Sequence, residues 1–262
     1  MKKIFFSLEA GVSFLADKGI LTWALLLAIW SAAARFNSVD FLPGPLATLR
    51  GAKEIITNGI LPLYIGISFC RIVIGWALGL LIAIPLGLVV GQFHIVRRIV
   101  EPFLNFFRFV PAIGFLTLFL MWFGVGEESK IVLIMYATIF PVVINTIAGV
   151  QHIDPIKLQA AQSQGASALQ TFYSIIIPAS IPHIFTGVRL GLGGAIIAIV
   201  AAEMLAAQQG IGYLIYTSRL YFRTDWIFVG ILTLGLMGYF SDKLLRLLGG
   251  TVLKKYGVKD GR

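Results

Sequence analysis

Long apolar blocks dominate the chain and alternate with short polar stretches. Each block comes near the length of about 20 residues that a helix needs to cross the hydrocarbon core of a bilayer. The predicted spans are 20–36, 65–91, 103–123, 131–150, 181–207 and 226–248. The pattern therefore predicts an all-α integral membrane protein with six transmembrane helices.

The composition supports a membrane protein. Of the 262 residues, 58% are hydrophobic and only 13% are charged, whereas soluble domains carry about 25% charged residues. The predicted spans use nearly all of the chain and leave no room for a second folded domain. We expect a single transmembrane domain over residues 1–262.

The longest polar interruption, residues 151–180, lies between the fourth and fifth predicted spans. A stretch this rich in Ala and Gln must lie in water, where it can form short helices. Gly165 is the expected break between two such helices, because glycine accepts the left-handed geometry that ends a helix. Pro178 suits the first turn of the next membrane helix, where a missing N–H costs nothing.

Basic residues predict the orientation. With both termini in the cytoplasm, the inner pieces hold Lys2, Lys3, Lys18, Arg97, Arg98, Lys157, Lys243, Arg246, Lys254, Lys255, Lys259 and Arg262. The outer pieces hold only Arg35, Arg50, Lys53, Arg71, Lys130, Arg219 and Arg223. The positive-inside rule then places residues 151–180 in the cytoplasm. The excess of basic residues is thus explained by membrane orientation, and nucleic acid is not an expected partner.

The N-terminal apolar run is interrupted by Glu9, Asp17 and Lys18. A secretory signal peptide has a continuous apolar core followed by a small-residue cleavage site. We therefore expect the first residues to be a retained cytoplasmic lead.

Two further patterns concern packing. Leu46, Leu49, Ala52 and Ile56 recur at helical spacing and predict an amphipathic helix on the outer face, either as an anchor or as a contact for a docked protein. Small residues four apart let membrane helices approach closely. The motifs are Gly75-x3-Gly79 and Gly87-x3-Gly91 in the second span, and Gly187-x3-Gly191 with Gly193 and Gly194 in the fifth. The fifth-span cluster is also a candidate for lining a moving path.

Four residues inside the apolar blocks are candidates for a translocation path or gate: Arg108, Pro111, Arg189 and Glu203. Charges in a membrane are costly and mark functional positions. Arg189 and Glu203 are about 21 Å apart along one helix, so each needs a partner elsewhere. Arg108 is expected in the first turns of the third span, where it can reach the interface. Pro111 should kink that helix.

The chain shows no sign of its own energy source or cofactor. No Gly-x4-Gly-Lys-Ser/Thr motif occurs, so the energy for transport must come from another chain or from an ion gradient. The single cysteine, Cys70, and the three histidines, His94, His152 and His183, lack metal-ligand spacing. They also form no catalytic cluster, which disfavours a membrane enzyme.

Residues 159–178 read Gln-Ala-Ala-x3-Gly-x9-Ile-x-Ile-Pro. The defined positions are Gln159, Ala160, Ala161, Gly165, Ile175, Ile177 and Pro178. This pattern resembles the Glu-Ala-Ala loop of ABC importer permeases. Gln159 stands where the motif usually has Glu, and Ile177 where it usually has Leu. The resemblance implies that the segment forms a coupling helix that docks on a cytoplasmic ATPase.

Further stretches are similar to the nitrate, sulfonate, taurine and bicarbonate branch of these permeases. They are Leu42-Pro43-x-Pro45, Ser68-x2-Arg71-x3-Gly75, Trp122-Phe123-Gly124-x-Gly126-Glu127, Val200-Ala201-Ala202-Glu203-Met204, Gly210-x-Gly212-Tyr213-Leu214 and Arg223-Thr224-Asp225. One departure is Phe109-Val110-Pro111-Ala112, where many relatives carry Arg-Pro-x-Pro-Pro.

The resemblance implies a type I ABC importer permease in the bacterial inner membrane. It implies a homodimer around one central path, with two cytoplasmic ATPase subunits that bind ATP and Mg. It also implies a periplasmic or lipid-anchored binding protein that delivers a small anionic solute of the nitrate, sulfonate, taurine or bicarbonate class. Vitamin precursors or aromatic compounds are alternative substrates.

An ion-coupled secondary transporter stays open as an alternative. Such a protein would show repeated halves with interrupted helices, or several carboxylates near the midplane. The chain offers only Glu203 as a candidate acid and no clear internal repeat.

Overall fold

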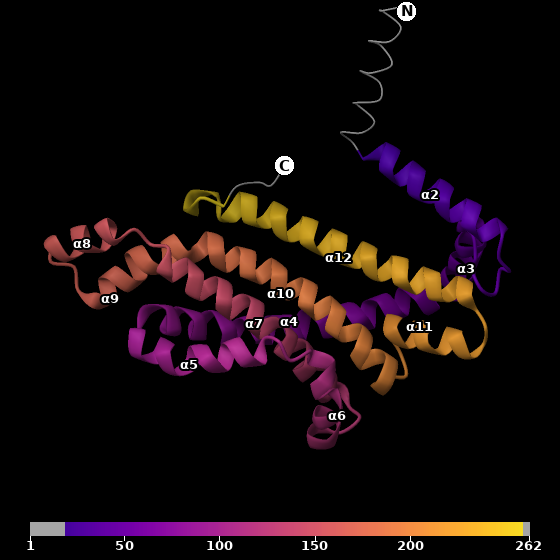
Figure 1. Cartoon of the computed structure of the whole chain (residues 1–262), viewed down its shortest axis with the longest axis horizontal. Coiled ribbons are helices and arrows are strands. Elements are labelled where there is room, and N and C mark those ends of the chain that lie inside the picture. The colour runs from indigo at the N-terminus through magenta and orange to yellow at the C-terminus, as the bar shows by residue number, and fades with distance from the viewer. Residues whose placement is uncertain (1–18, 259–262) are drawn as a thin grey trace, which may run out of the picture. The chain divides into compact units, whose positions relative to one another are not determined.

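The structure, a computed structural model, describes residues 19–258 (Figure 1). The predicted N-terminal lead, residues 1–18, and the last residues, 259–262, lie outside the described part. Every regular element within residues 19–258 is a helix, and no strand occurs there. The expected all-α fold is confirmed. The contacts divide the chain into two compact units, Met1–Pro62 with Leu214–Ile231, and Leu63–Tyr213 with Leu232–Arg262.

The first unit contains α2 (Ile20–Arg35), α3 (Pro45–Thr57), most of α11 (Ile211–Leu220) and the first turns of α12 (Thr224–Val252). Trp30 stacks on Phe228, with ring centroids 5.5 Å apart. The Arg223 guanidinium bridges Glu54 and Asp225 at 2.5 and 2.9 Å. The hydrogen bond from Arg223 holds the pKa of Glu54 below its usual value, so the pair stays charged at neutral pH.

Helix α3 is the predicted amphipathic helix. Its apolar residues Leu46, Leu49 and Ile56 are exposed, whereas Thr48 and Ile55 on another face are buried. An apolar stripe that stays exposed within its own unit fits a helix lying in a membrane interface.

The second unit is built from helices that lie side by side. They are α4 (Ile60–Gln92), α5 (His94–Phe107), α6 (Ala112–Phe123), α7 (Glu127–Gln151), α8 (Pro155–Ser163), α9 (Ala168–Thr171), the π-helix η1 (Phe172–Ile176), α10 (Ile177–Ala206), the later part of α12 and the short 3-10 helix η2 (Lys254–Tyr256). Glycine contacts place α12 along α10, at Gly238 with Ile196 and at Gly249 with Phe185.

The predicted number of six spans is too high for the described residues. Four helical segments there are long and apolar enough to cross a membrane, and a bent pair would make a fifth. The four are Ile60–Gln92, Glu127–Gln151, Ala168–Ala206 and Thr224–Val252. Helix α2 is apolar but has 16 residues, which gives it a length of about 24 Å. That is shorter than a hydrocarbon core of about 30 Å.

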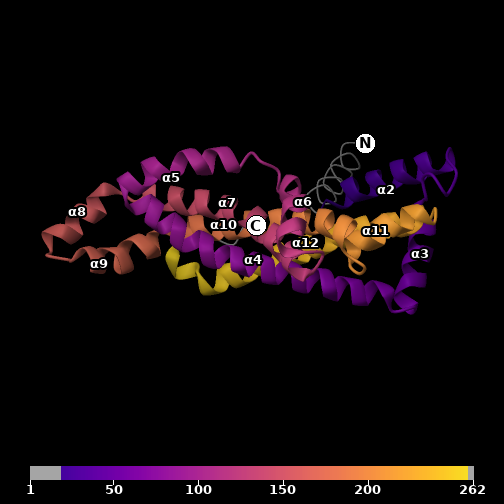
Figure 2. The same cartoon turned by 90° about the horizontal axis from the view of Figure 1, so that it is seen from below.

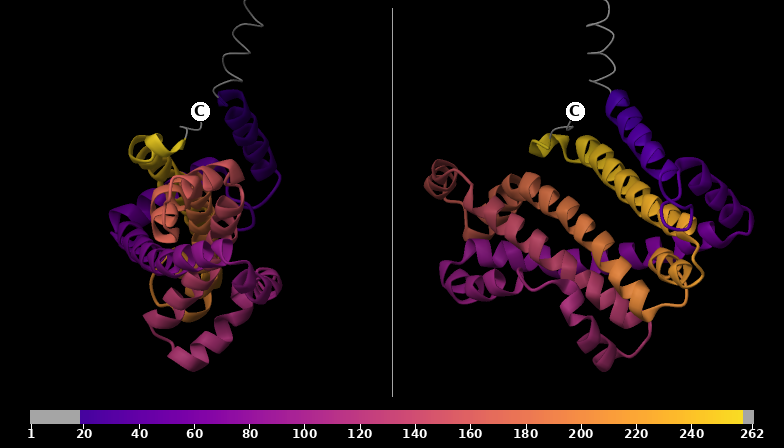
Figure 3. Two further views of the ribbon diagram at one scale, coloured as in Figure 1. Left: turned by 90° about the vertical axis from the view of Figure 1, so that its left-hand side faces the viewer. Right: turned by 45° about the vertical axis from the view of Figure 1, so that its right-hand side comes forward.

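The predicted third span, residues 103–123, is wrong as a single helix. The structure breaks it into α5 and α6, which meet at an angle of 97° (Figures 1 and 3). Pro111 is the N-cap of α6 and has an extended backbone. Proline cannot donate the next helical hydrogen bond, and it disfavours helical geometry in the residue before it. The expected kink is therefore a complete change of direction.

Small residues on α4 let it pack closely against α7. A Cβ added at Gly75, Gly79, Gly87 or Gly91 would meet the Cβ of Ile134, Thr138, Thr146 or Val150, respectively, at 2.5–2.7 Å. A step of four residues along α4 moves the contact four residues along α7, so the two helices run parallel. The predicted packing role of both second-span motifs is confirmed.

This interface predicts a large effect for one substitution. Gly87→Leu should lower the free energy of unfolding by about 1–3 kcal/mol or more, because the new Cβ would lie 2.5 Å from the Cβ of Thr146. Gly66→Leu is the matched control, since Gly66 lies on the same helix and a Cβ there meets nothing within 4 Å. Unfolding of the purified variants in mixed micelles measures the difference. Equal stability of the two variants would contradict this packing.

The fifth-span glycines serve a second interface. Gly187 and Gly191 face Val142, and Gly194 faces the carbonyl of Ala137 at 2.8 Å. Moving forward along α10 moves the contact backward along α7, so these two helices are antiparallel. Gly193 differs, because a Cβ there meets nothing within 4 Å. The fifth-span cluster is thus mainly a packing face with one open position.

Candidate functional site

Residues 151–180, here called the coupling segment, form two short helices that lie together at one end of the second unit (Figure 2). The Asp154 side chain caps α8 by accepting from Ile156 N at 2.9 Å. Ser167 and Gln170 form a capping box at the start of α9. Gly165 lies between them with φ +77°, the left-handed geometry that ends a helix. The predicted break at Gly165 is confirmed.

The coupling segment continues into the membrane helix without interruption. The π-helix η1 joins α9 to α10, so Ala168–Ala206 is one helical segment of 39 residues. Pro178 lies in the first turn of α10, as predicted. Ile175 and Ile177 pack against a buried cluster that includes Val150 and Ile176. The segment is thereby joined to α10 by packed side chains as well as by a continuous helical backbone.

Several side chains of the coupling segment are exposed among residues 19–258. Gln159 and Ala160 are exposed, whereas Ala161 is buried. Leu169 and Tyr173 are 66% and 62% exposed. Large apolar residues exposed on a polar segment outside the long apolar helices are typical of a contact surface for another protein.

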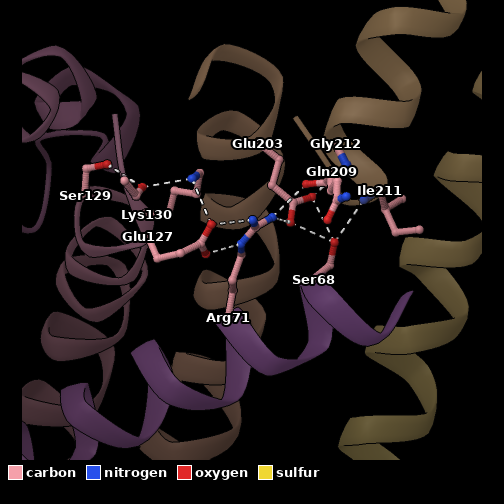
Figure 4. Close-up of polar contacts among 10 residues, drawn as sticks. Ser68, Arg71, Glu127, Ser129, Lys130, Glu203, Gln209, Ile211 and Gly212 are labelled. Atoms are coloured by element: carbon pink, nitrogen blue, oxygen red, sulfur yellow. Dashed lines mark hydrogen bonds and ion pairs between the residues drawn. The ribbon is translucent and has the colours of Figure 1, made fainter. Parts of the chain in front are cut away.

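Glu203, near the opposite end of α10, is completely buried (Figure 4). Its carboxylate accepts hydrogen bonds from Ser68 Oγ at 2.8 and 2.9 Å and from Arg71 Nη1 at 2.8 Å. It also accepts from the backbone N–H of Gly212 at 2.8 Å. Ser68 Oγ in turn accepts from Ile211 N at 2.9 Å. The sequence predicted that Glu203 needs a partner from another segment, and Arg71 of α4 is that partner.

Arg71 links Glu203 to a second carboxylate. Its Nε and Nη2 donate to both oxygens of Glu127, at 2.5 and 2.6 Å. Lys130 Nζ lies 3.1 Å from Glu127 Oε1. The two basic and two acidic groups balance, which makes the burial of Arg71, Lys130 and Glu203 tolerable. The Glu127 side chain itself is 54% exposed. We call this set of four residues the ion network.

The ion network corrects one assignment made from the sequence. Arg71 and Lys130 were expected among the outer polar pieces, but they are only 7% and 3% exposed and lie inside α4 and α7. Arg71 is held by carboxylates of α7 and α10, whereas Lys130 is held by Glu127 and the carbonyl of Gly126 at the start of its own helix.

Arg189 also has its partner on another helix. Its Nε and Nη2 lie 2.7 and 3.1 Å from the two oxygens of Asp242 on α12, and Arg246 Nε lies 3.1 Å from the same carboxylate. Arg189 and Asp242 line a groove of about 670 Å³ between α10 and α12. The remaining lining is apolar and includes Leu192, Ile196, Val200 and Met204.

Arg108 lies elsewhere than expected. It is the C-cap of α5, after 14 helical residues, and not in the first turns of its span. The reason is that the helix begins already at His94, nine residues before the predicted bound of 103. Arg108 and Pro111 line a cavity of about 380 Å³ at the bend between α5 and α6.

The structure brings some of the candidate path residues together and separates one. The cavity at the bend and the groove share Ile113, Ile197 and Ala201, so the two are contiguous. Arg108, Pro111 and Arg189 thus line one continuous surface. Glu203 lines neither space and belongs to the ion network.

The sequence reasoning missed Arg71, Glu127 and Asp242. A signal was present, because Arg71, although counted among the outer basic residues, lies inside the predicted span 65–91, and Asp242 lies inside the predicted span 226–248. Opposite charges placed in different apolar segments have to find one another.

Comparison with known proteins agrees with this geometry. Residues 79–252 match the family described as "Binding-protein-dependent transport system inner membrane component". The chain is 34% identical to the taurine transport system permease protein of Escherichia coli, over 87% of this chain and 85% of that protein. It is also 34% identical to a putative aliphatic sulfonates transport permease protein of Bacillus subtilis, over 90% of this chain and 87% of that protein.

A solved structure shares the fold. Inward-facing conformations of the MetNI methionine ABC transporter align with a TM-score of 0.58 and 16% identity, covering 71% of this chain and 96% of the matched chain. The family match spans well over half of the chain, and the two permeases align with nearly all of it. This protein therefore belongs to the binding-protein-dependent transport system inner membrane components, the permease subunits of ABC importers.

Proposed function

We propose that two copies of this chain form the translocation path of an ATP-driven importer, with both termini in the cytoplasm. Two ATPase subunits bind ATP and Mg and dock on the coupling segments, at a surface that includes Gln159 and Ala160; the buried Ala161 supports that surface from beneath. A separate binding protein delivers the solute from the opposite side. The proposed substrate is a small anion of the nitrate, sulfonate, taurine or bicarbonate class. A vitamin precursor or aromatic compound is the alternative.

One observation carries the coupling role. The coupling segment exposes apolar side chains and is continuous with α10, which reaches Glu203 and the ion network. Helix α10 rises about 1.5 Å per residue and crosses the unit. An ATPase that moved α9 would therefore move this whole helix as a rigid rod. Membership of the importer permease family favours this mechanism over coupling to an ion gradient.

The relatives support the substrate class. One is a permease of a taurine system and another of a putative aliphatic sulfonate system. Both names describe compounds with a sulfonate group, which carries one negative charge at neutral pH; in taurine an ammonium group accompanies it. The contiguous cavity and groove of this chain contain two arginine residues, Arg108 and Arg189, against one carboxylate, Asp242. That excess of positive charge suits an anion.

The decisive experiment is co-expression of this chain with a candidate ABC ATPase and purification by a tag on the permease. We expect the two proteins to elute together and ATP hydrolysis to rise when a binding protein is added. Uptake into proteoliposomes should require hydrolysable ATP and survive an uncoupler. A stable permease that never retains an ATPase, with uptake that collapses with the ion gradient, would overturn the proposal.

A further inference from the structure

We infer that the cavity at the bend between α5 and α6 is an anion-binding site of the permease itself, and that its ligand is an organic anion with an apolar body. Arg108 holds the acidic group, and the adjoining groove between α10 and α12 holds the apolar part. This inference rests on the proposed function and specifies its substrate. It excludes nitrate and bicarbonate as the principal cargo.

The first argument is the charge of Arg108. Three other arginine residues within the long helices, Arg71, Arg189 and Arg246, each lie within 4.0 Å of a carboxylate. Among residues 19–258, no carboxylate lies within that distance of Arg108, whose guanidinium lies 4.6 Å from the centroid of the Phe109 ring. Arg108 is exposed at the C-terminal end of α5, at the bend of a helix pair that is apolar overall. An exposed guanidinium without a carboxylate beside it can take up an added acidic group.

The second argument is the surroundings of Arg108. It is the only charged residue in the described lining of the cavity of about 380 Å³. Tyr136, which also lines the cavity, donates its hydroxyl to the carbonyl of Phe107 at 3.0 Å and so holds the end of α5 in place. The guanidinium is thereby positioned on a fixed backbone, with its donors available to an acidic group. Arginine presents a planar fork of donors that matches such groups.

The third argument is the adjoining groove. It is contiguous with the cavity through Ile113, Ile197 and Ala201, and its two charged residues, Arg189 and Asp242, bind each other. The groove of about 670 Å³ is otherwise apolar. An inorganic anion gains nothing from apolar walls, whereas each buried CH₂ raises affinity by about fourfold. Open space at Gly193 leaves room for such a chain.

The test is titration calorimetry on the purified permease in lipid nanodiscs, with empty nanodiscs as the control for partition into lipid. Methanesulfonate, butanesulfonate, hexanesulfonate and nitrate are the probes. We expect affinity to rise by about fourfold per added CH₂ until the groove is filled, and nitrate to bind at least tenfold more weakly than butanesulfonate.

Three variants locate the site. Arg108→Gln should weaken the binding of every sulfonate by at least tenfold. Arg108→Lys, which keeps the charge, should weaken this binding less. Arg98→Gln is the matched control, because Arg98 is exposed on the same helix and lines neither space. Gly193→Leu should fill the groove and abolish the dependence on chain length while methanesulfonate still binds. Thermal unfolding of each variant checks that it is folded.

Several results would overturn the inference. They are equal affinity for nitrate and hexanesulfonate, unchanged sulfonate binding by Arg108→Gln, and no binding of any probe. The last result is expected if a second copy of the chain fills the groove. The proposed function is tested separately. If the permease binds no anion but its complex with the ATPase still takes up solute, only this inference falls. If no ATPase is retained, the importer function falls whatever the permease binds.

Discussion

Replacing Arg71 with methionine is expected to lower the free energy of unfolding by about 3–5 kcal/mol. Arg71 is 7% exposed and is the one residue that binds both Glu203 and Glu127. Its loss would leave the fully buried Glu203 carboxylate with no positive partner. Removing one member of a buried pair costs more than removing both, because the remaining charge stays uncompensated. Unfolding by SDS in mixed micelles, followed by tryptophan fluorescence, measures the change.

Three comparisons make this prediction specific. Arg71→Lys should lower the free energy of unfolding by less than Arg71→Met does, because lysine keeps the charge. It should still cost some stability, because lysine lacks the planar fork that reaches both carboxylates. Adding Glu203→Gln to Arg71→Met should recover part of the loss, because the neutral amide still accepts from Ser68 and Gly212. Arg50→Met, on the exposed surface of α3, should have little effect. A single Arg71→Met variant as stable as the wild type would show that the network does not hold these helices together.

Replacing Gly165 with valine should reduce ATP-driven uptake at least tenfold while the protein still inserts into the membrane. Gly165 has φ +77° and a Cβ there meets nothing within 4 Å. The substitution would therefore act through the backbone alone, at a cost of about 1–2 kcal/mol for an ordinary residue in left-handed geometry. We expect the coupling segment to avoid that cost by changing its turn, which would present a different surface to the proposed ATPase.

Uptake into proteoliposomes, set against the amount of protein in the membrane, measures this effect. Gly165→Asn is the matched control, because asparagine tolerates left-handed geometry and is found at helix ends. It should retain most of the activity. A valine variant with normal uptake would count against the role of the turn, and an inactive asparagine variant would point to a contact of the glycine itself.

Features that depend on neighbours in sequence were predicted well. Gly165 ends α8, and Pro178 lies in the first turn of α10, because both residues act on the backbone at their own position. The glycines of the second and fifth spans pack against α7 as small residues should. The break at Pro111 was anticipated only as a kink. Its angle of 97° depends on what α5 and α6 pack against, and no local pattern encodes that.

The four candidate path residues lie in two different places. Arg108, Pro111 and Arg189 line contiguous spaces, but Glu203 belongs to a network that binds α4, α7 and α10 together. The expected place of Arg108 within its helix was wrong, because that place depends on where the helix begins. Helix bounds that are read from apolar runs are uncertain by several residues.

The local sequence pattern predicts a bundle of apolar helices with one long polar segment between them, because hydrophobic length and turn chemistry act over a few residues. It also predicts that the charges inside the helices need partners, since an isolated charge in lipid is too costly. Which partners they have is visible only in the folded chain. Arg71 meets Glu203, and Arg189 meets Asp242, across 132 and 53 positions of the chain. Such pairings follow from which helices lie side by side, and close packing at small residues sets that arrangement.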